Sequence, residues 1–122
     1  MSYIKKRISA FGYAFNGLWY SFKSEAHLKI QLLAALVVIV LGFYFSVTSS
    51  EWAILLICCG SVISLELVNS AIEKLCDLIT TEQNPKIKYI KDVMAGAVLV
   101  ASMTAAVIGI LIFYPYFKQF IS

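Results

Sequence analysis

Three long runs of apolar residues constrain this chain more than any other feature of its sequence. Residues 30–47 and 93–114 carry no charge, and residues 52–65 form another uncharged run. A helix needs about 20 residues, at about 1.5 Å each, to cross a hydrocarbon core about 30 Å thick. We therefore predict an all-α integral membrane protein with spans over about residues 29–47, 52–79 and 91–114, the last of which ends before Pro115.

The composition agrees with a membrane location. Of the 122 residues, 61% are hydrophobic and 14% are charged, and the mean hydropathy is +0.84, which is far more apolar than a water-soluble domain. We expect residues 1–122 to form a single membrane-embedded domain. A chain this short cannot enclose both a deep water-filled site and a lipid-facing shell, so we expect it to oligomerise and to share a site between subunits.

The basic residues indicate how the chain crosses the membrane. All but one lie on one side of the three spans, and only Lys118 lies on the other. The positive-inside rule makes the basic side cytoplasmic, so the N-terminus and the loop of about residues 79–91 are expected in the cytoplasm and the C-terminus outside. The net charge of +3 does not indicate a nucleic-acid partner, because the basic residues follow this topology and form no single basic face.

The segment before the first span has the pattern of an amphipathic helix. Apolar residues recur in steps of three and four and form one stripe, made of Tyr3 or Ile4 and then Ile8, Phe11, Phe15, Leu18 and Phe22. We expect a surface helix over about residues 3–24 that lies in the plane of an anionic leaflet. The alternative is a helix that packs against the other helices.

Polar residues follow a regular spacing where the second apolar run continues as a helix. Glu66, Asn69, Glu73 and Asp77 fall at i, i+3, i+7 and i+11, within an arc of roughly 80° on one helix face. Glu66 is expected below the cytoplasmic surface but within the membrane, where an ionisable residue is costly and usually functional. Because converging carboxylates repel unless a cation or proton is shared, the stripe predicts a Mg²⁺ site that also holds substrate phosphates.

A plainer interpretation of the same stripe stays open. In that interpretation the carboxylates lie at the solvated cytoplasmic end of a long helix and have no metal-binding role. They would form ion pairs with Lys74 or with lysines of a neighbouring subunit. Glu25, at the junction between the surface helix and the first span, either joins the metal or is an ordinary interfacial acid. Lys91 and Asp92 follow the polar loop 80–85 and are placed to meet phosphate and ribose or adenine, although Asp92 also suits a helix cap.

The familiar nucleotide-binding loop is missing. Gly12 and Gly17 have the glycine spacing of a P-loop, but Leu18 and Trp19 stand where that loop requires Lys and Ser or Thr. Any phosphate handling must therefore rest on a metal ion and side chains.

Residues 66–77 resemble the signature E-x-x-N-S/T-A-I-E-x-x-x-D of the prokaryotic diacylglycerol kinases, whose relatives in Gram-positive bacteria act on undecaprenol. Further matching pieces lie at Gly12 and Tyr13, Gly17 and Leu18, Glu25 and Ala26, and Lys91 and Asp92. The resemblance implies a kinase of the bacterial inner membrane that uses ATP and Mg²⁺ to phosphorylate a lipid hydroxyl. It also implies a homotrimer with composite sites between protomers.

The same resemblance implies roles for individual residues. Glu66 matches the general base, Glu25 and Glu73 match the metal ligands, and Asn69 matches a polar group that supports the site. The remaining matches are residues that bind the nucleotide, namely Lys6, Tyr13, Asp77, Glu82, Asn84, Lys91 and Asp92.

Some positions differ from the proteobacterial members of that family. Ser9 and Ala14 stand where those enzymes have a lysine and a serine, whereas residues 95–99 look more like the undecaprenol branch. The third span offers few hydrogen-bond donors beside the expected site, so the two ester groups of diacylglycerol would lack partners. We therefore expect undecaprenol, which has no esters, to be phosphorylated at least as well as diacylglycerol.

One interpretation from a different functional class remains. In a non-enzymatic membrane subunit or a cation-conducting protein, the same carboxylate stripe would line a cation path.

Overall fold

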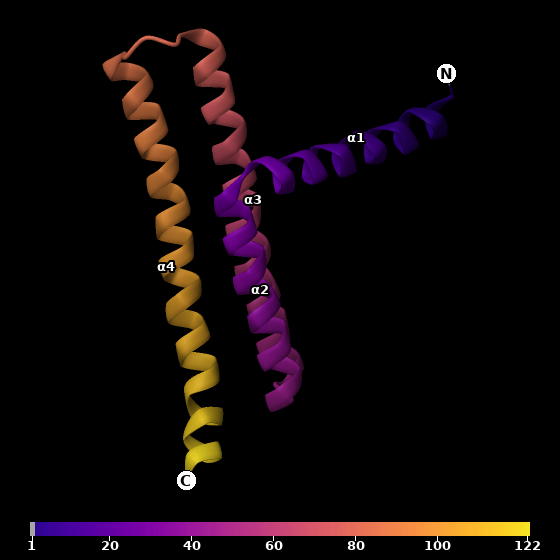
Figure 1. The fold of residues 1–122 in the computed structure, drawn as a ribbon. Helices are drawn as coiled ribbons and strands as arrows, with labels where there is room; N and C mark the ends of the chain where they lie inside the picture. The colour runs from indigo at the N-terminus through magenta and orange to yellow at the C-terminus, as the bar shows by residue number, and fades with distance from the viewer. Residues whose placement is uncertain (1) are drawn as a thin grey trace.

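The computed structural model describes residues 2–122, and these form four helices and no strand. Figure 1 shows α2 (Ala26–Phe45), α3 (Ser49–Ile79) and α4 (Pro85–Ile121) running lengthwise, while α1 (Tyr3–Ser24) projects sideways from them. α2, α3 and α4 are each long and apolar enough to cross a membrane. The predicted all-α fold with three candidate spans is confirmed.

Local sequence signals explain where each helix begins and ends. Glu25 adopts an extended conformation that separates α1 from α2. Ser46, with φ of 52°, ends α2 in the left-handed region, and Thr48 then forms a capping box with Glu51 at the start of α3. At the other end of the bundle, Asn84 accepts a hydrogen bond from the Lys86 amide and caps α4.

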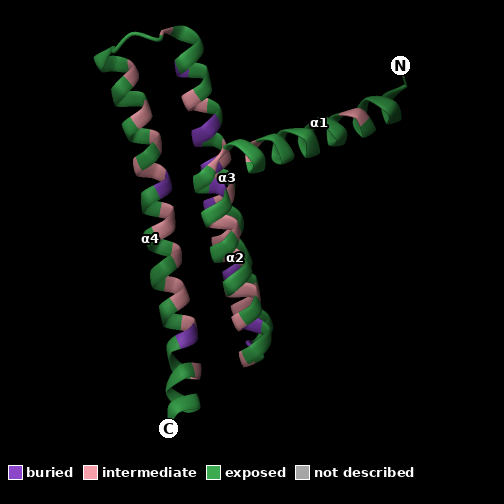
Figure 2. Ribbon diagram, in the orientation of Figure 1, coloured by how far each residue is buried: buried purple, intermediate pink, exposed green. Residues whose placement is uncertain are grey.

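A cluster of buried hydrophobic residues lies at the end of the bundle where α2 turns into α3. Val47, Leu55 and Phe113 form its buried cluster, and the indole of Trp52 lies directly over Gly42. A Cβ atom at Gly42 would come within 2.5 Å of that ring, so this turn requires glycine. The far end of α3, which carries the polar stripe, lies away from this cluster (Figure 2).

The expectation that the last helix ends before Pro115 is wrong, because α4 continues through Pro115 to Ile121. A proline inside a helix removes one backbone hydrogen bond, but neighbouring contacts hold the turn that follows. Tyr116 donates a hydrogen bond to Glu51 on α3, and Phe117 packs against Phe45 of α2 with ring centroids 4.9 Å apart. Tertiary contacts therefore outweigh the local signal to stop.

α1 matches the expected helix over residues 3–24, although nothing in the fold reveals a membrane surface beside it. Its apolar stripe is exposed, and it has no buried residue. Only its second half, from Phe15 onward, borders α2 and α3, where Phe15, Trp19 and Phe22 line a groove together with Leu28 and Leu67. The first half packs on no other helix in Figure 1, so its position at a membrane surface stays a prediction.

Candidate functional site

The polar stripe of α3 becomes progressively more exposed toward the loop that joins α3 to α4. Glu66 is 5% exposed and Asn69 8%, Glu73 is half-buried and Asp77 is exposed. Neither of the two ion pairs among residues 2–122 includes Glu66. Because a buried carboxylate without a cationic partner is costly, Glu66 has the properties of a functional group rather than a structural one.

Asn69 connects the buried and exposed parts of this stripe. Its Nδ2 donates a hydrogen bond to Oε1 of Glu73, one turn further along α3, at 3.5 Å. Its Oδ1 is buried and accepts no hydrogen bond within the part of the chain that the structure describes. Buried polar atoms normally have a partner, so this oxygen is available to a ligand.

The donor atoms of the stripe suit a hard cation. Within residues 2–122 no three His, Cys, Asp or Glu side chains lie close enough to form a metal site by themselves. Glu66, Glu73 and the free amide oxygen of Asn69 nevertheless offer only oxygen donors. Mg²⁺ commonly binds to one or two carboxylates and completes its shell with water and substrate phosphates, so this incomplete set fits Mg²⁺ better than a metal that needs a full protein cage.

Glu25 lies at the end of α2 that borders this part of α3. It is half-buried at the junction with α1. One turn further, Leu28 lines a groove with Leu67 of α3, and the ammonium of Lys74 lies 5.9 Å from the ring centroid of Tyr20 in α1. These contacts bring the α1–α2 junction to the level of the stripe.

A pocket of about 730 Å³ opens where α3 and α4 meet the loop between them. Five of the predicted nucleotide-binding residues line it, namely Asp77, Glu82, Asn84, Lys91 and Asp92. Its size is in the range of about 300–1,000 Å³ typical of small-molecule sites. These five predicted residues therefore line one pocket, contributed by the end of α3, the loop and the start of α4.

Two ion pairs shape this pocket. Lys91 Nζ lies 2.8 Å from Asp77 Oδ1, and Lys88 Nζ lies 2.6 Å from Asp92 Oδ2. Asp77 is thus paired across the loop and not with Lys74. Asp92 forms an ion pair one turn along α4, and the helix cap is provided by Asn84. Exposed ion pairs contribute little stability, so either lysine can exchange its carboxylate for another anion at little cost.

Lys6 and Tyr13 do not line this pocket. Both lie on the exposed first part of α1, which projects away from α3 and α4 (Figure 1). One chain alone does not bring these two predicted contacts to the others.

Ser70 and Lys88 are polar residues near the site that received no role of their own from the sequence. Ser70 is 6% exposed and lies beside Asn69 on the buried face, and Lys88 lines the pocket. The i, i+4 spacing of Lys88 and Asp92 was the signal available for that pair. Burial of Ser70 depends on helix packing, which the spacing of the charged residues does not reveal.

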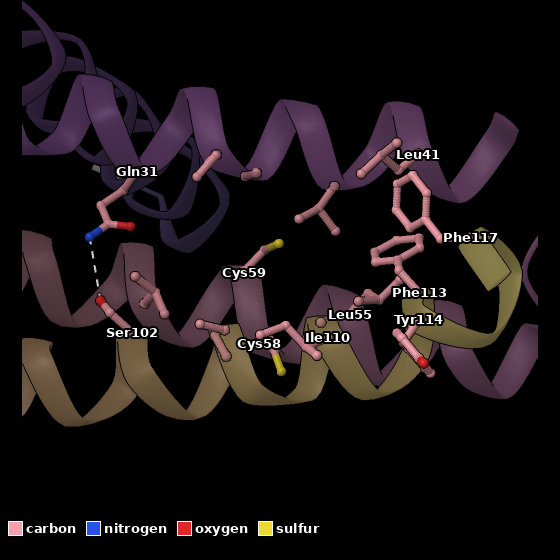
Figure 3. A pocket seen from close by; sticks show the side chains of 17 residues that line it. Gln31, Leu41, Leu55, Cys58, Cys59, Ser102, Ile110, Phe113, Tyr114 and Phe117 are labelled. Atoms are coloured by element: carbon pink, nitrogen blue, oxygen red, sulfur yellow. Dashed lines mark hydrogen bonds between the residues drawn. The ribbon is translucent and has the colours of Figure 1, made fainter. Parts of the chain in front are cut away.

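A second pocket, almost wholly apolar and about 480 Å³ in volume, lies between α2, α3 and α4. Figure 3 shows Gln31 Nε2 donating a hydrogen bond to Ser102 Oγ at one end of this pocket, at 3.4 Å. Val62 also lines it, one helical turn before Glu66.

Comparisons with known proteins agree with these features. Residues 12–113 match the sequence model of the family described as prokaryotic diacylglycerol kinase. The chain is 37% identical to undecaprenol kinase of Bacillus subtilis over 92% of its own length and 91% of the relative's. It is 33% identical to diacylglycerol kinase of Pseudomonas aeruginosa over 80% of both chains, and 28% identical to that of Escherichia coli over 90% of both.

Proposed function

This chain belongs to the prokaryotic diacylglycerol kinase family and is an ATP-dependent lipid kinase, and we propose that Glu66 is the general base that activates the lipid hydroxyl. The observation that carries this role is the burial of Glu66 without a cationic partner within residues 2–122. Membership in a kinase family sets aside the alternative of a non-enzymatic or cation-conducting subunit.

In the proposed reaction the lipid hydroxyl approaches Glu66 from the bilayer and ATP approaches from the polar pocket. Glu66 accepts the hydroxyl proton as the lipid oxygen forms a bond to the γ-phosphorus. The bond between that phosphorus and the β–γ bridging oxygen breaks in line, and ADP leaves. The chain itself mainly positions the two substrates and balances their charge.

Glu73 and Glu25 would hold Mg²⁺, and Asn69 would support them through its hydrogen bond to Glu73. When bound with ATP, the ion neutralises charge on the phosphates. Lys91 is the proposed phosphate contact at the pocket, released from Asp77 when ATP binds. Asp77, Glu82, Asn84 and Asp92 would contact the rest of the nucleotide.

We further propose a homotrimer with composite sites, in which Lys6 and Tyr13 of one protomer approach the pocket of another. The exposed first part of α1 supports this arrangement, because one chain alone leaves both residues outside the pocket. Homo-oligomers are usually symmetric. In a symmetric trimer, α1 of each protomer would contact the pocket of one neighbour, and the pocket of that protomer would be contacted by α1 of the other neighbour.

Mixing two inactive variants tests the shared site. Glu66→Gln subunits and Tyr13→Ala/Lys6→Ala subunits are unfolded, mixed in equal amounts and reassembled. If sites are shared, each site takes Glu66 from one protomer and α1 from another. In an equal mixture each of these two contributions is intact in half of the sites, so about a quarter of the wild-type activity returns. Recovery of no activity would place both halves of the site on one protomer.

The lipid that we propose is undecaprenol, with diacylglycerol as the second candidate. The relatives are named for both lipids, and identity is higher to the undecaprenol kinase than to the two diacylglycerol kinases compared above. The polar side chains that line the apolar pocket are few, and Gln31 and Ser102 already bond to each other. Two ester groups without partners would cost on the order of 1–3 kcal/mol each.

Competition between the two lipids, at equal mole fraction in one detergent with radiolabelled ATP, tests the substrate. We expect undecaprenol to be phosphorylated at least as fast as diacylglycerol. A preference for diacylglycerol above about tenfold, which corresponds to about 1.4 kcal/mol in transition-state binding, would reject undecaprenol.

For the position in the cell we propose the bacterial inner membrane, with the N-terminus and the α3–α4 loop in the cytoplasm and the C-terminus outside. The distribution of basic residues supports this orientation, because only Lys118 lies at the α4 C-terminal end. α1 would lie as an amphipathic helix in the cytoplasmic surface, with its exposed apolar stripe toward the lipid.

A further inference from the structure

Lys88 is a charged residue of the polar pocket that the proposed reaction does not use. It lines the pocket between α3 and α4 together with Lys91, and its Nζ lies 2.6 Å from Oδ2 of Asp92. The side chain of Lys88 is 77% exposed, whereas that of Lys91 is 38% exposed. Of the two lysines, Lys88 is thus the one more accessible to a ligand that arrives from solvent.

Helix stability does not explain a lysine at position 88. The ion pair with Asp92 spans one helical turn with the lysine before the acid, which is the less favourable order in a helix. Lys86 and Lys88 also lie in the first turn of α4, which contains no acidic residue. Cations are unfavourable there, because the N-terminus of a helix carries a partial positive charge. The placement of Lys88 therefore favours an anion from outside the helix.

The charges that line the pocket indicate what that anion is. Three carboxylates line it, those of Asp77, Glu82 and Asp92, and within residues 2–122 the cationic side chains of that lining are Lys88 and Lys91. Without Lys88 the negative charges would exceed the positive ones by two, and the pocket would repel the phosphates of ATP. Lys88 and Lys91 are three residues apart on one face of α4, with Cβ atoms about 5–6 Å apart. Both ammonium groups can therefore reach one chain of phosphates.

We propose that Lys88 is a second phosphate contact of the nucleotide, beside Lys91, and that it leaves Asp92 when ATP binds. The exchange frees the Asp92 carboxylate for the sugar or base of the same nucleotide. This inference rests on the proposed function, because it adds a contact to the pocket proposed to bind ATP. The Lys88–Asp92 pair is exposed and contributes little stability, so a phosphate replaces the carboxylate at little cost.

Lys86 provides a matched control for the test. It lies in the first turn of α4 and is exposed, as Lys88 is, but it does not line the pocket. Lys88→Gln and Lys86→Gln each remove one positive charge from the same turn, so they change the net charge and the interaction with the helix dipole alike. Lys88→Arg keeps the charge in the pocket. Lys91→Gln tests whether the pocket binds the nucleotide at all.

The experiment measures KM for ATP and kcat at low and at high ionic strength, with the full-length protein in detergent micelles and with saturating Mg²⁺ and lipid alcohol. A unit charge a few ångströms away in water is worth about a three- to tenfold change in affinity. We therefore expect Lys88→Gln to raise KM by that factor at low ionic strength and to leave kcat unchanged. The increase should shrink at high ionic strength, because salt screens exposed charges. Lys88→Arg and Lys86→Gln should keep KM within about twofold of the wild-type value.

The outcomes separate this inference from the function on which it rests. A raised KM in Lys91→Gln with an unchanged KM in Lys88→Gln would overturn the phosphate contact and leave the nucleotide pocket in place. An unchanged KM in both variants would remove the proposed nucleotide pocket and the inference together. An increase in Lys88→Gln that salt does not reduce, accompanied by a lower thermal unfolding midpoint, would assign Lys88 a structural role and overturn the inference. Lys88→Met removes the same charge and gives the same readout if Lys88→Gln fails to fold.

Discussion

Asn69 donates a hydrogen bond from Nδ2 to Glu73 Oε1 at 3.5 Å, and its own Oδ1 remains buried without a partner among residues 2–122. The amide is therefore fixed by one carboxylate and presents an oxygen on the face that carries Glu66. The hydrogen bond thus involves a proposed metal ligand, and Asn69 lies one helical turn beyond the proposed base on the same helix. Its disruption has a specific consequence for the Mg²⁺ requirement.

Replacing Asn69 by Ala removes both the hydrogen bond that orients Glu73 and the free oxygen. Residues that orient metal ligands typically contribute ten- to a hundredfold to metal affinity or activity, so we expect a loss of about that size and a higher Mg²⁺ concentration for half-maximal rate. Val68→Ala is the control, because Val68 is the 47% exposed neighbour. A normal Mg²⁺ titration for Asn69→Ala would rule out this supporting role.

Glu73→Ala and Glu25→Ala should each weaken nucleotide binding only when Mg²⁺ is present. A carboxylate that holds the ion contributes to the binding of Mg·ATP but not to that of free ATP. Titration calorimetry with Mg²⁺ and with a chelator supplies the comparison within each variant. Unchanged Mg·ATP affinity in both variants would place the metal elsewhere.

Tyr116 donates a hydrogen bond to Glu51, and this bond connects the last turns of α4 to the start of α3. Tyr116→Phe should lower the thermal unfolding midpoint by a few degrees and leave the specific activity below that temperature unchanged, because this contact is far from the stripe. Tyr114→Phe is the matched control, since Tyr114 is 62% exposed and donates no hydrogen bond within residues 2–122. Equal midpoints for the two variants would show that the contact adds no stability.

Much of the fold follows from the sequence. An apolar run of about 20 residues in a membrane must satisfy its own backbone hydrogen bonds, and a helix does so. The break at Pro115 was predicted wrongly because the contacts of Tyr116 and Phe117 are tertiary and leave no local signal. The helical spacing placed Glu66, Asn69, Glu73 and Asp77 on one face. It did not indicate that Asp77 pairs with Lys91, because that contact depends on how the loop folds back.

The predicted nucleotide contacts fall into two groups: those that one chain brings together, and those that it leaves apart. Residues 77–92 are close in sequence, so a single tight connection between α3 and α4 brings them to one pocket. Lys6 and Tyr13 lie in the first half of α1, which packs on no other helix of the same chain. Where α1 lies relative to another protomer is not encoded in the spacing of its own residues.

The most direct test of Glu66 as general base is Glu66→Gln, with phosphoryl transfer from radiolabelled ATP and binding of Mg·ATP measured on one preparation. Glutamine keeps the size of the side chain but cannot accept the hydroxyl proton. General-base catalysis is worth about 10²–10⁴ in rate, so turnover should fall by that range while Mg·ATP affinity is retained. Turnover near that of the wild-type protein would contradict the role of Glu66 as base.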